Sequence, residues 1–364
     1  MMREGFYKVV RSVFVVALSV LTLGLVLVCV VFALLYGLAV RTRLALYRIG
    51  LLPKRRVMVP VISVGNLSMG GTGKTPFAGL LARRLALCGL RPAVVSRGYK
   101  AKGGRSDEAL MLLEEMPDLI HVEHPDRHAA AQEAIRAGAQ VIVLDDGFSH
   151  LRLARDLDIL LIDAITPFGQ EQWLPLGFFR EPLSSMKRAD WVVVTRCDTV
   201  KKKVLRGIDK RLEKYGVPRS RILHAEHQAS SLLPVRGVPP VANPHDLKDR
   251  RVWAVSGLAH PRGFHRTLKR LGAKVVGIRA LPDHFHYDAE WCAARWPQIE
   301  AAALKNGAEF IVVTHKDAVK LRQHLTSTHI PVAELRIEIV IREGVERIDE
   351  LLQAVIDKHN SSQG

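Results

Sequence analysis

The chain has 364 residues, more than one hydrophobic core usually serves, so we expect two folded domains in addition to any membrane segment. Its 53 Lys and Arg residues exceed its 36 Asp and Glu residues, which predicts attraction to an anionic partner: nucleic acid, a phospholipid surface or a phosphorylated substrate. The four cysteines lie far apart and form no CxxC pair, which argues against a disulfide framework and against a zinc knuckle.

The first predicted element is a long apolar helix near the amino terminus. No charged residue occurs between Arg11 and Arg41, and the apolar run over residues 13–40 exceeds the ~20 residues needed to cross a bilayer. A cleaved signal peptide would have an apolar region of roughly 7 to 15 residues and a small-residue cleavage site, which this run does not match. We therefore expect residues 1–45 to form a membrane anchor.

Basic residues flank this helix unevenly. They are Arg3, Lys8 and Arg11 on the amino side, and Arg41, Arg43, Arg48, Lys54, Arg55 and Arg56 on the carboxyl side. Because loops rich in Lys and Arg stay on the cytoplasmic side, the catalytic part of the chain is expected to face the cytoplasm. Each of these cations is expected to add roughly 1 kcal/mol of attraction to an anionic leaflet.

Beyond the anchor, short β-branched runs alternate with segments of helical period. This alternation is typical of a mostly parallel sheet covered by helices. The first series of expected strands comprises residues 59–64, 93–96, 141–145, 159–163 and 191–195. The second series comprises residues 252–256, 274–279 and 310–314, with helices near 263–271 and 289–305 and a last helix near the end of the chain.

A glycine-rich turn lies between the first expected strand and the start of a helix. It comprises Ser68, Met69, Gly70, Gly71, Thr72, Gly73, Lys74 and Thr75, and Pro76 follows. Glycines in such a turn let backbone N–H groups point inward at the phosphate oxygens of ATP; Lys74 is expected to reach the β- and γ-phosphates, and the Thr75 hydroxyl to ligate Mg²⁺. Because Ser68 stands where the strict GxxxxGK[ST] pattern has glycine, the turn follows the GGxGKT variant of a deviant branch of P-loop proteins.

Because this turn lies between a strand and a helix in a series of alternating strands and helices, the expected fold class is α/β. We expect a P-loop-containing three-layer α/β/α domain with a mostly parallel sheet over residues 46–231. A Pro-rich run with few periodic positions predicts a linker over residues 232–249. A second, smaller α/β domain is expected over residues 250–364, and the N-terminal transmembrane helix precedes both domains.

Phosphoryl transfer to a hydroxyl needs an anchored metal ion, cations on the transferred group and a base at the acceptor. Asp145 and Asp146 end a buried strand, the usual position for a carboxylate that contacts the metal ion or its waters. Acids at strand ends are also common helix caps, so this pattern alone leaves both interpretations open. Asp107, taken by itself, is an ordinary acid at the start of a helix.

Six motifs, in order, make the chain similar to the tetraacyldisaccharide 4′-kinase family of lipid A biosynthesis. They are Gly65-Asn66-Leu67 with the glycine-rich turn, Ser96-Arg97-Gly98-Tyr99, Ser106-Asp107-Glu108, Asp145-Asp146-Gly147-Phe148-Ser149-His150, Phe179-Arg180-Glu181-Pro182 and Pro282-Asp283-His284-Phe285. The resemblance runs from about residue 59 to residue 319. It implies two α/β domains with the active site between them.

This resemblance also implies an activity and its partners. The ATP γ-phosphate would be transferred, with Mg²⁺, to the 4′-hydroxyl of a tetraacylated glucosamine disaccharide 1-phosphate. The reaction would take place at the bacterial inner membrane, on the cytoplasmic side. The glycolipid and the membrane are the partners implied, with no nucleic acid and no required protein partner.

The resemblance further implies roles for single residues. Asp107 and His284 match an acceptor-activating pair, Lys74 and Arg180 match contacts to the transferred phosphate, and Thr75, Asp145, Asp146 and Glu181 match the metal site. Tyr99, His150 and Asp283 fall at positions that order the substrate or a loop. The chain departs from the family pattern at Met69, where Lys is often seen, at Ser106, at Ala109 and at Ser149, where Gly, Pro and Gln respectively are common. These departures leave the main chemistry intact and bear on local loop geometry.

Other functions are less consistent with the sequence. A membrane-tethered nucleotide switch of the same P-loop branch needs no lipid acceptor, and Thr195-Arg196-Cys197-Asp198 has Arg where guanine readers carry Lys. A nucleic-acid-binding protein is suggested only by net charge, without a reading motif and with few aromatic residues for base stacking. A zinc site at His284 and His286 lacks further ligands at suitable spacing.

Overall fold

The computed structural model describes residues 2–98, 105–169, 171–258 and 261–361 of the chain. It contains an eleven-stranded sheet in the order β3-β2-β4-β1-β5-β6-β7-β11-β10-β8-β9. The strands are β1 (Val61–Gly65), β2 (Pro92–Ser96), β3 (Ile120–Glu123), β4 (Val141–Asp145), β5 (Leu157–Asp163), β6 (Trp191–Thr195), β7 (Ile222–Arg236), β8 (Arg251–Ser256), β9 (Lys274–Ala280), β10 (Phe310–Thr314) and β11 (Val332–Ile341). All neighbours pair in parallel except β7 and β11, which are antiparallel.

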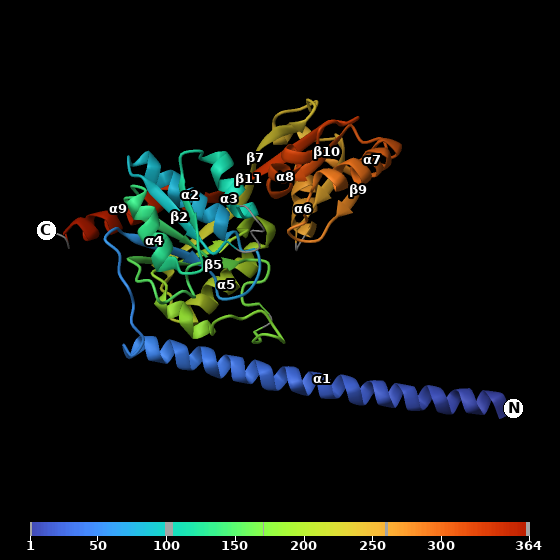
Figure 1. The fold of residues 1–364 in the computed structure, drawn as a ribbon, viewed down its shortest axis with the longest axis horizontal. Coiled ribbons are helices and arrows are strands. Elements are labelled where there is room, and N and C mark those ends of the chain that lie inside the picture. Colours follow the sequence, from blue (N-terminus) through green and yellow to red (C-terminus); the bar gives the residue numbers. More distant parts are fainter. Residues whose placement is uncertain (1, 99–104, 170, 259–260, 362–364) are drawn as a thin grey trace.

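Helices cover both faces of this sheet. The helices of the described residues are α1 (Met2–Arg48), α2 (Lys74–Leu87), α3 (Asp107–Glu115), α4 (Arg127–Arg136), α5 (Lys202–Lys214), α6 (Pro261–Arg270), α7 (Ala289–Lys305), α8 (His315–His324) and α9 (Glu346–Ser361), and all of them except α1 belong to the body of the molecule (Figure 1). Side chains of α2, α3 and α9 share one core cluster with β1 and β4, whereas α4 and α5 pack in clusters on the opposite face. This is the three-layer α/β/α arrangement expected for the first half.

Short polar side chains define where several helices begin. Ser106 Oγ accepts from the Ala109 N–H at the start of α3, and Asp126 accepts from the backbone of residues 128 and 129 at the start of α4. Asp288 and Thr314 cap α7 and α8 in the same way. These caps satisfy backbone donors that have no partner inside a helix. The start of α2 is different, because no side chain caps it.

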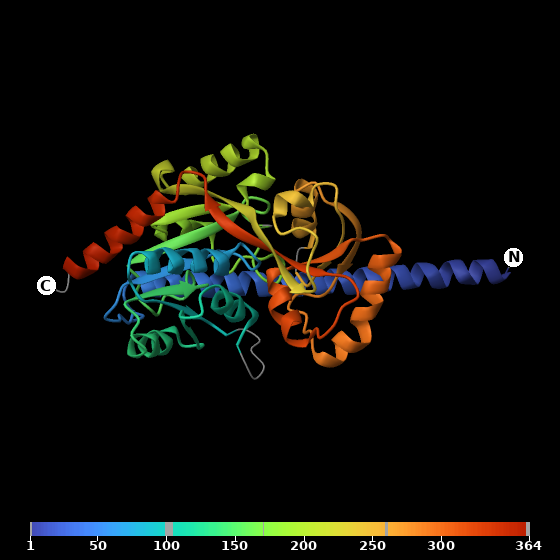
Figure 2. The same cartoon turned by 90° about the horizontal axis from the view of Figure 1, so that it is seen from above.

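The sheet joins two lobes through its longest strands. β7 and β11 pair over ten residue positions, from Val332 opposite Arg236 to Ile341 opposite Ala225 (Figures 1 and 2). The predicted linker over residues 232–249 therefore begins inside β7, which continues to Arg236. We did not predict β3, β7 or β11 from the sequence, whereas the other eight strands lie at or within two residues of the expected positions.

The end of the chain returns to the first lobe. Ile348 and Leu352 of α9 are buried in the same cluster as Phe77 and Leu81 of α2. β11 carries the chain back to the first lobe, so α9 packs with α2 although the two helices are far apart in sequence (Figure 1). Residues 250–364, predicted as one domain, thus contribute to the cores of both lobes.

The amino-terminal helix α1 extends away from the body of the molecule (Figure 1). Among the described residues, Thr22–Arg48 is the one segment long and apolar enough to cross a membrane by length and composition, and little of it is buried. Its carboxyl end contacts the first lobe: the Tyr36 ring meets Trp173 edge-on at 6.0 Å, and the Arg43 guanidinium donates to Ser149 O (2.9 Å). The helix is therefore attached to the lobe that carries the glycine-rich turn.

Candidate active site

The glycine-rich turn follows the fully buried strand β1 and leads directly into α2. Gly73 is the residue before the helix, and its φ of 88° lies in the left-handed region. Gly70 has a φ of 130°. Side chains with a Cβ rarely adopt either conformation, so these two positions require glycine. Inside the turn, Asn66 Nδ2 donates to Thr72 Oγ1 (3.1 Å), which fixes its curvature.

The amino end of α2 offers uncapped backbone donors. An uncapped helix start presents N–H groups and the positive end of the helix dipole, a combination that binds phosphate. Pro76, the third residue of α2, has no N–H, so one donor of this cradle is missing. Lys74 Nζ lies at the cradle, 3.2 Å from Gly70 O and 3.8 Å from Asp146 Oδ1. Burial lowers the pKa of Lys74, while the Asp146 charge acts in the opposite direction.

Asp145 and Asp146 end the central strand β4 beside this cradle. Asp145 Oδ2 accepts from Thr75 Oγ1 (2.6 Å), and its Oδ1 is buried without a hydrogen-bond partner. Burial raises the pKa of Asp145 to about 6, although the Thr75 hydrogen bond opposes the rise. Hydroxyl and carboxylate oxygens are the ligands that Mg²⁺ prefers, and the unpartnered oxygen is available to the ion or to one of its waters. The residues present therefore fit a magnesium site.

Arg180 and Asp146 form a bidentate pair at the same place. Arg180 Nη1 and Nη2 donate to the two Asp146 oxygens (2.8 and 2.7 Å), and Nη2 also donates to Asn66 Oδ1. Burial acts to raise the pKa of Asp146, but the Arg180 hydrogen bonds and the Lys74 charge outweigh it and hold the pKa at about 2. Asp146 is therefore ionised at every physiological pH.

Glu181, which the resemblance places at the metal site, has a cation as its partner. Its carboxylate is 1% exposed and accepts from Arg188 Nη1 (3.0 Å) and Nη2 (3.3 Å). Arg188 also donates to Phe148 O (2.8 Å) and stacks over the Phe148 ring. In this conformation Glu181 supports the loop after β4 through Arg188.

A second group of charged side chains lies where α3 of the first lobe meets the second lobe. Asp107, the first residue of α3, accepts from His284 Nδ1 (3.1 Å between the nitrogen and Oδ2) and from Lys320 Nζ (3.0 Å). His284 has φ 58°, in the left-handed region, and its backbone N–H donates to Asp283 Oδ1. Lys316 Nζ holds the same Asp283 oxygen (2.9 Å). Residues more than 170 positions apart in the sequence thus meet at one point.

Glu108 links this second group to the cradle. Its Oε1 lies 4.0 Å from His284 Nε2, the imidazole nitrogen that does not face Asp107. The Glu108 charge also acts to raise the pKa of Lys74 and of Asp145. Such an electrostatic effect falls off with distance, so the Glu108 carboxylate lies near enough to the cradle for its charge to act there.

A model of the tetraacyldisaccharide-1-P 4′-kinase family matches residues 25–357. The chain belongs to this family. Tetraacyldisaccharide 4′-kinase from Pelobacter propionicus is 38% identical over 339 residues, which cover 88% of this chain and 90% of the relative. The protein of the same name from Geobacter sulfurreducens is 41% identical over 313 residues, covering 80% and 83% of the two chains.

A solved structure of a 4′-kinase has the same fold. It is the "apo" form of LpxK from Aquifex aeolicus in complex with ATP, with a TM-score of 0.68 and 29% sequence identity. The likeness covers 90% of this chain and 98% of that chain. The predicted α/β architecture of the 4′-kinase is therefore confirmed.

The structure brings together most positions for which the 4′-kinase family implies a role. Lys74, Thr75, Asp145, Asp146 and Arg180 lie around the cradle. Asp107, His284 and Asp283 form the second group, and Tyr99 lies outside the described residues. His150 lies in the loop after β4; its Nε2 is buried without a partner, and burial beside several arginines lowers its pKa to about 4. Its position is consistent with ordering that loop.

Several residues of the 4′-kinase site were not singled out from the sequence. Lys320 and Lys316 project from α8 at a spacing of one helical turn, a pattern that many solvated helices share. His227 of β7 lies beside the cradle, since a Cβ added at Gly73 would come within 3.1 Å of its Nε2. That nitrogen is buried without a partner, and burial near Arg196 lowers the pKa of His227 to about 4. Because β7 itself was not predicted, no sequence signal pointed to His227.

The segment after β6 argues against guanine recognition. Asp198, at the position where guanine readers bind the base, accepts from His227 N (3.1 Å) and from the Arg270 guanidinium. Arg196 adopts φ 57°, and its guanidinium donates to Gly71 O and to Asp163 Oδ2. Both carboxylate oxygens of Asp198 are therefore engaged within the protein.

Proposed function

We propose that this 4′-kinase transfers the γ-phosphate of ATP to the 4′-hydroxyl of a tetraacylated glucosamine disaccharide 1-phosphate, giving the 1,4′-bisphosphorylated lipid A precursor. Membership of the family supports the reaction class. The observation that carries the proposal is the position of Glu108, which acts electrostatically on Lys74 and lies 4.0 Å from His284 Nε2. This position supports a phosphate donor site and a base for a hydroxyl acceptor that adjoin each other.

ATP is the donor, and the turn over residues 68–75 is its triphosphate site. Lys74 and the free N–H groups of α2 would compensate the phosphate charges. Arg180 is charged and lies beside the cradle, where it would contact the γ-phosphate after exchanging its bonds to Asp146. Thr75 and Asp145 would hold Mg²⁺, and Asp146 and Glu181 would orient its waters, Glu181 after exchanging its bonds to Arg188. The ion would neutralise charge on the phosphates.

Asp107 and His284 activate the acceptor. The hydrogen bond from Nδ1 to Asp107 fixes the imidazole with its proton on Nδ1, which leaves Nε2 free to accept the proton of the sugar hydroxyl. Asp107 stabilises the imidazolium that results. Lys320 holds the same Asp107 oxygen and thereby fixes its position. General-base assistance of this kind is worth about 10²- to 10⁴-fold in rate.

The domain assignment follows the same geometry. We propose that residues 46–231, together with α9, bind ATP, and that residues 250–341 supply His284 and complete the cleft. The contact of Arg270 in α6 with Asp198 after β6 supports a cleft between two parts. We further propose that α1 anchors the enzyme in the bacterial inner membrane with the catalytic part in the cytoplasm, where both ATP and the glycolipid headgroup are accessible.

The test is a transfer assay with the purified full chain in detergent. The protein is incubated with γ-labelled ATP, Mg²⁺ and tetraacyl disaccharide 1-phosphate, and the lipid is extracted. Label is expected in the lipid, and none when the acceptor is omitted. Label recovered only as free phosphate in water would contradict the proposal and favour a membrane-tethered nucleotide switch.

A further inference from the structure

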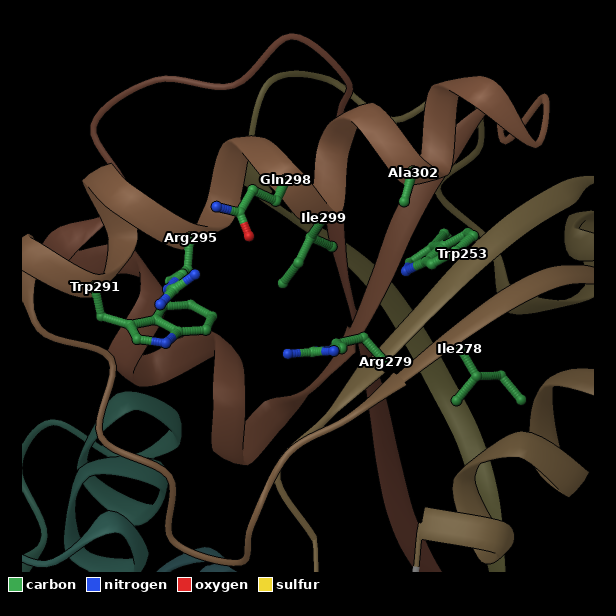
Figure 3. Close-up of a pocket in the computed structure, with 8 residues that line it drawn as sticks. All are labelled: Trp253, Ile278, Arg279, Trp291, Arg295, Gln298, Ile299 and Ala302. Atoms are coloured by element: carbon green, nitrogen blue, oxygen red, sulfur yellow. The ribbon is translucent and has the colours of Figure 1, made fainter.

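The second lobe contains a cavity that lies outside the kinase site. It has a volume of about 510 Å³ and lies between α7 and the strands β8 and β9. Trp291, Arg295, Gln298, Ile299 and Ala302 line it from one face of α7, because their spacing of three or four residues places them above one another. Trp253, Ile278 and Arg279 form the opposite side (Figure 3). The size is within the ~300–1,000 Å³ typical of pockets for small ligands.

The polar groups that line this cavity are mainly donors without acceptors. Arg279 and Arg295 are exposed side chains that form no ion pair among the described residues. The indole nitrogen of Trp253 is buried and has no hydrogen-bond partner. Figure 3 shows Arg279 extending into the space beneath α7, with Arg295 beside Trp291. The cavity therefore combines two positive charges and an unused N–H group.

One wall of the cavity is formed by the Trp253 ring, which packs directly on the backbone of β9. A Cβ at Gly277 of β9 would lie 1.9 Å from Trp253 Cζ3, so only glycine lets the indole lie flat over this strand. On the other side, the ring of Trp291 meets Phe285 at 4.9 Å and Tyr287 at 5.4 Å, both edge-on. These contacts hold each indole in place, and a rigid aromatic surface loses little conformational entropy when a ligand packs on it.

We propose that this cavity is a binding site for a phosphate monoester carried on a sugar ring. The two guanidinium groups match phosphate oxygens in charge and in geometry, and arginine is the side chain best suited to bidentate phosphate binding. The indoles and Ile299 provide flat apolar surfaces for the C–H faces of the ring. Inorganic phosphate alone would fill only part of a cavity of this volume.

This site is separate from the ATP site. No residue of the turn over residues 68–75 lines the cavity, and α7 and β9 lie in the other lobe, well away from α1 (Figure 1). A soluble ligand therefore fits the site better than a lipid held in the bilayer. Trp291 also contacts Phe285, the residue that follows His284 in the sequence. The proposal concerns binding and does not depend on phosphate transfer.

Calorimetric titration of the full chain in detergent tests the proposal, with MgADP at saturation to fill the phosphate cradle. The probes are glucose 1-phosphate, glucose and inorganic phosphate. Glucose 1-phosphate is expected to bind saturably, inorganic phosphate about tenfold more weakly, and glucose not at all. The double variant R279Q/R295Q is expected to lose about 30-fold or more in affinity, since two charge-assisted contacts are removed.

The matched control is R262Q/R266Q, which removes two exposed arginines of α6 in the same lobe. It should bind glucose 1-phosphate as the unmodified protein does. Equal affinity in the R279Q/R295Q protein, or no saturable binding at about 10 mM, would overturn the proposal. Equal affinity for inorganic phosphate would overturn the assignment of a sugar phosphate. Thermal unfolding of each variant shows that the lobe is intact, because the substituted side chains are exposed.

Discussion

At the scale of single residues, the two adjacent acids at the end of β4, Asp145 and Asp146, have pKa values shifted in opposite directions. Asp145 is buried against an uncharged hydroxyl, and its pKa rises to about 6. Asp146 is buried as well, but Arg180 and Lys74 lower its pKa to about 2. The difference arises from the neighbours, since the two side chains are identical. Asp145 is thus the acid whose protonation competes with a metal ion near neutral pH.

The raised pKa of Asp145 predicts a pH-dependent cost to the fold. Because the folded-state pKa of about 6 lies above the ordinary value of 3.8, the unmodified protein loses stability as pH rises from about 4 to 6. Asp145→Asn removes this loss, so at pH 8 without nucleotide it should raise the free energy of unfolding by about 1–3 kcal/mol while abolishing transfer. Most of this difference should disappear at pH 4, because the folded protein is then protonated at Asp145. Thermal unfolding at both pH values checks this, and an equal difference at both would contradict it.

Asp107 is predicted to serve turnover rather than nucleotide binding. Asp107→Asn keeps the size of the side chain but weakens its hold on the His284 proton, so turnover should fall by about 10²- to 10⁴-fold. ATP affinity should stay within about twofold, as measured by equilibrium binding. Asp107→Ala should in addition lower the melting temperature, because it leaves the buried Lys320 ammonium without its partner. Unchanged turnover in either variant would remove Asp107 from the mechanism.

At the scale of elements, the cradle depends on a close approach between β1 and the loop after β4. A Cβ at Gly65 would lie 2.5 Å from Phe148 Cβ and 2.6 Å from its backbone nitrogen. Phe148 is fully buried, and Arg188 holds its carbonyl oxygen. Because neither segment has room to move, β1 and the loop after β4 are fixed relative to each other.

This close approach predicts different results for two glycines of neighbouring segments. Gly65→Ala should destabilise the protein by about 2–4 kcal/mol, because the added methyl group overlaps buried backbone. Gly71→Ala is the control: a Cβ there meets nothing within 4 Å, and no positive φ is required. Its melting temperature should stay within about 1 °C of the unmodified protein. Comparable loss in both variants would show that the contact at Gly65 does not determine stability.

At the scale of the whole molecule, charged pairs and one helix connect parts that are distant in sequence. Arg322 of α8 pairs with Glu114 of α3 and with the fully buried Glu334 of β11, and Arg336 holds the same two acids. This places α3, which begins with Asp107, against the lobe that carries His284. The geometry of the Asp107–His284 pair therefore depends on contacts between the lobes.

Packing of α9 on α2 predicts that the end of the chain stabilises the ATP site. Leu352→Ala creates a cavity in the core shared with α2 and should cost about 2–4 kcal/mol. The neighbouring exposed substitution Gln353→Ala should have an effect below about 0.5 kcal/mol. Melting followed with and without MgADP checks whether the loss falls on the ATP-binding lobe. If Leu352→Ala lowers only the temperature of a transition that MgADP does not affect, α9 supports the other lobe instead.

The elements that sequence patterns predicted are those set by local chemistry. The eight predicted strands are rich in β-branched residues, and all of them except β9 are largely buried. The GGxGKT turn was predicted from its own glycines and from the helix start that follows them. β7 and β11 were not predicted, since their half-exposed, mixed patterns gain stability mainly from pairing with each other. Without these strands, neither His227 nor the position of α9 was foreseeable.

The sequence by itself determined the long apolar helix, the glycine-rich turn, the acids at the end of β4 and the family to which the chain belongs. Only the tertiary structure decided which charges meet: Glu181 with Arg188, Asp107 with Lys320, and Asp198 with Arg270. The physical reason is that backbone conformation follows from neighbours along the chain, whereas an ion pair depends on distances that exist after the sheet has closed. The same holds for Arg279 and Arg295, which the fold places beside Trp253 and Trp291 in one cavity.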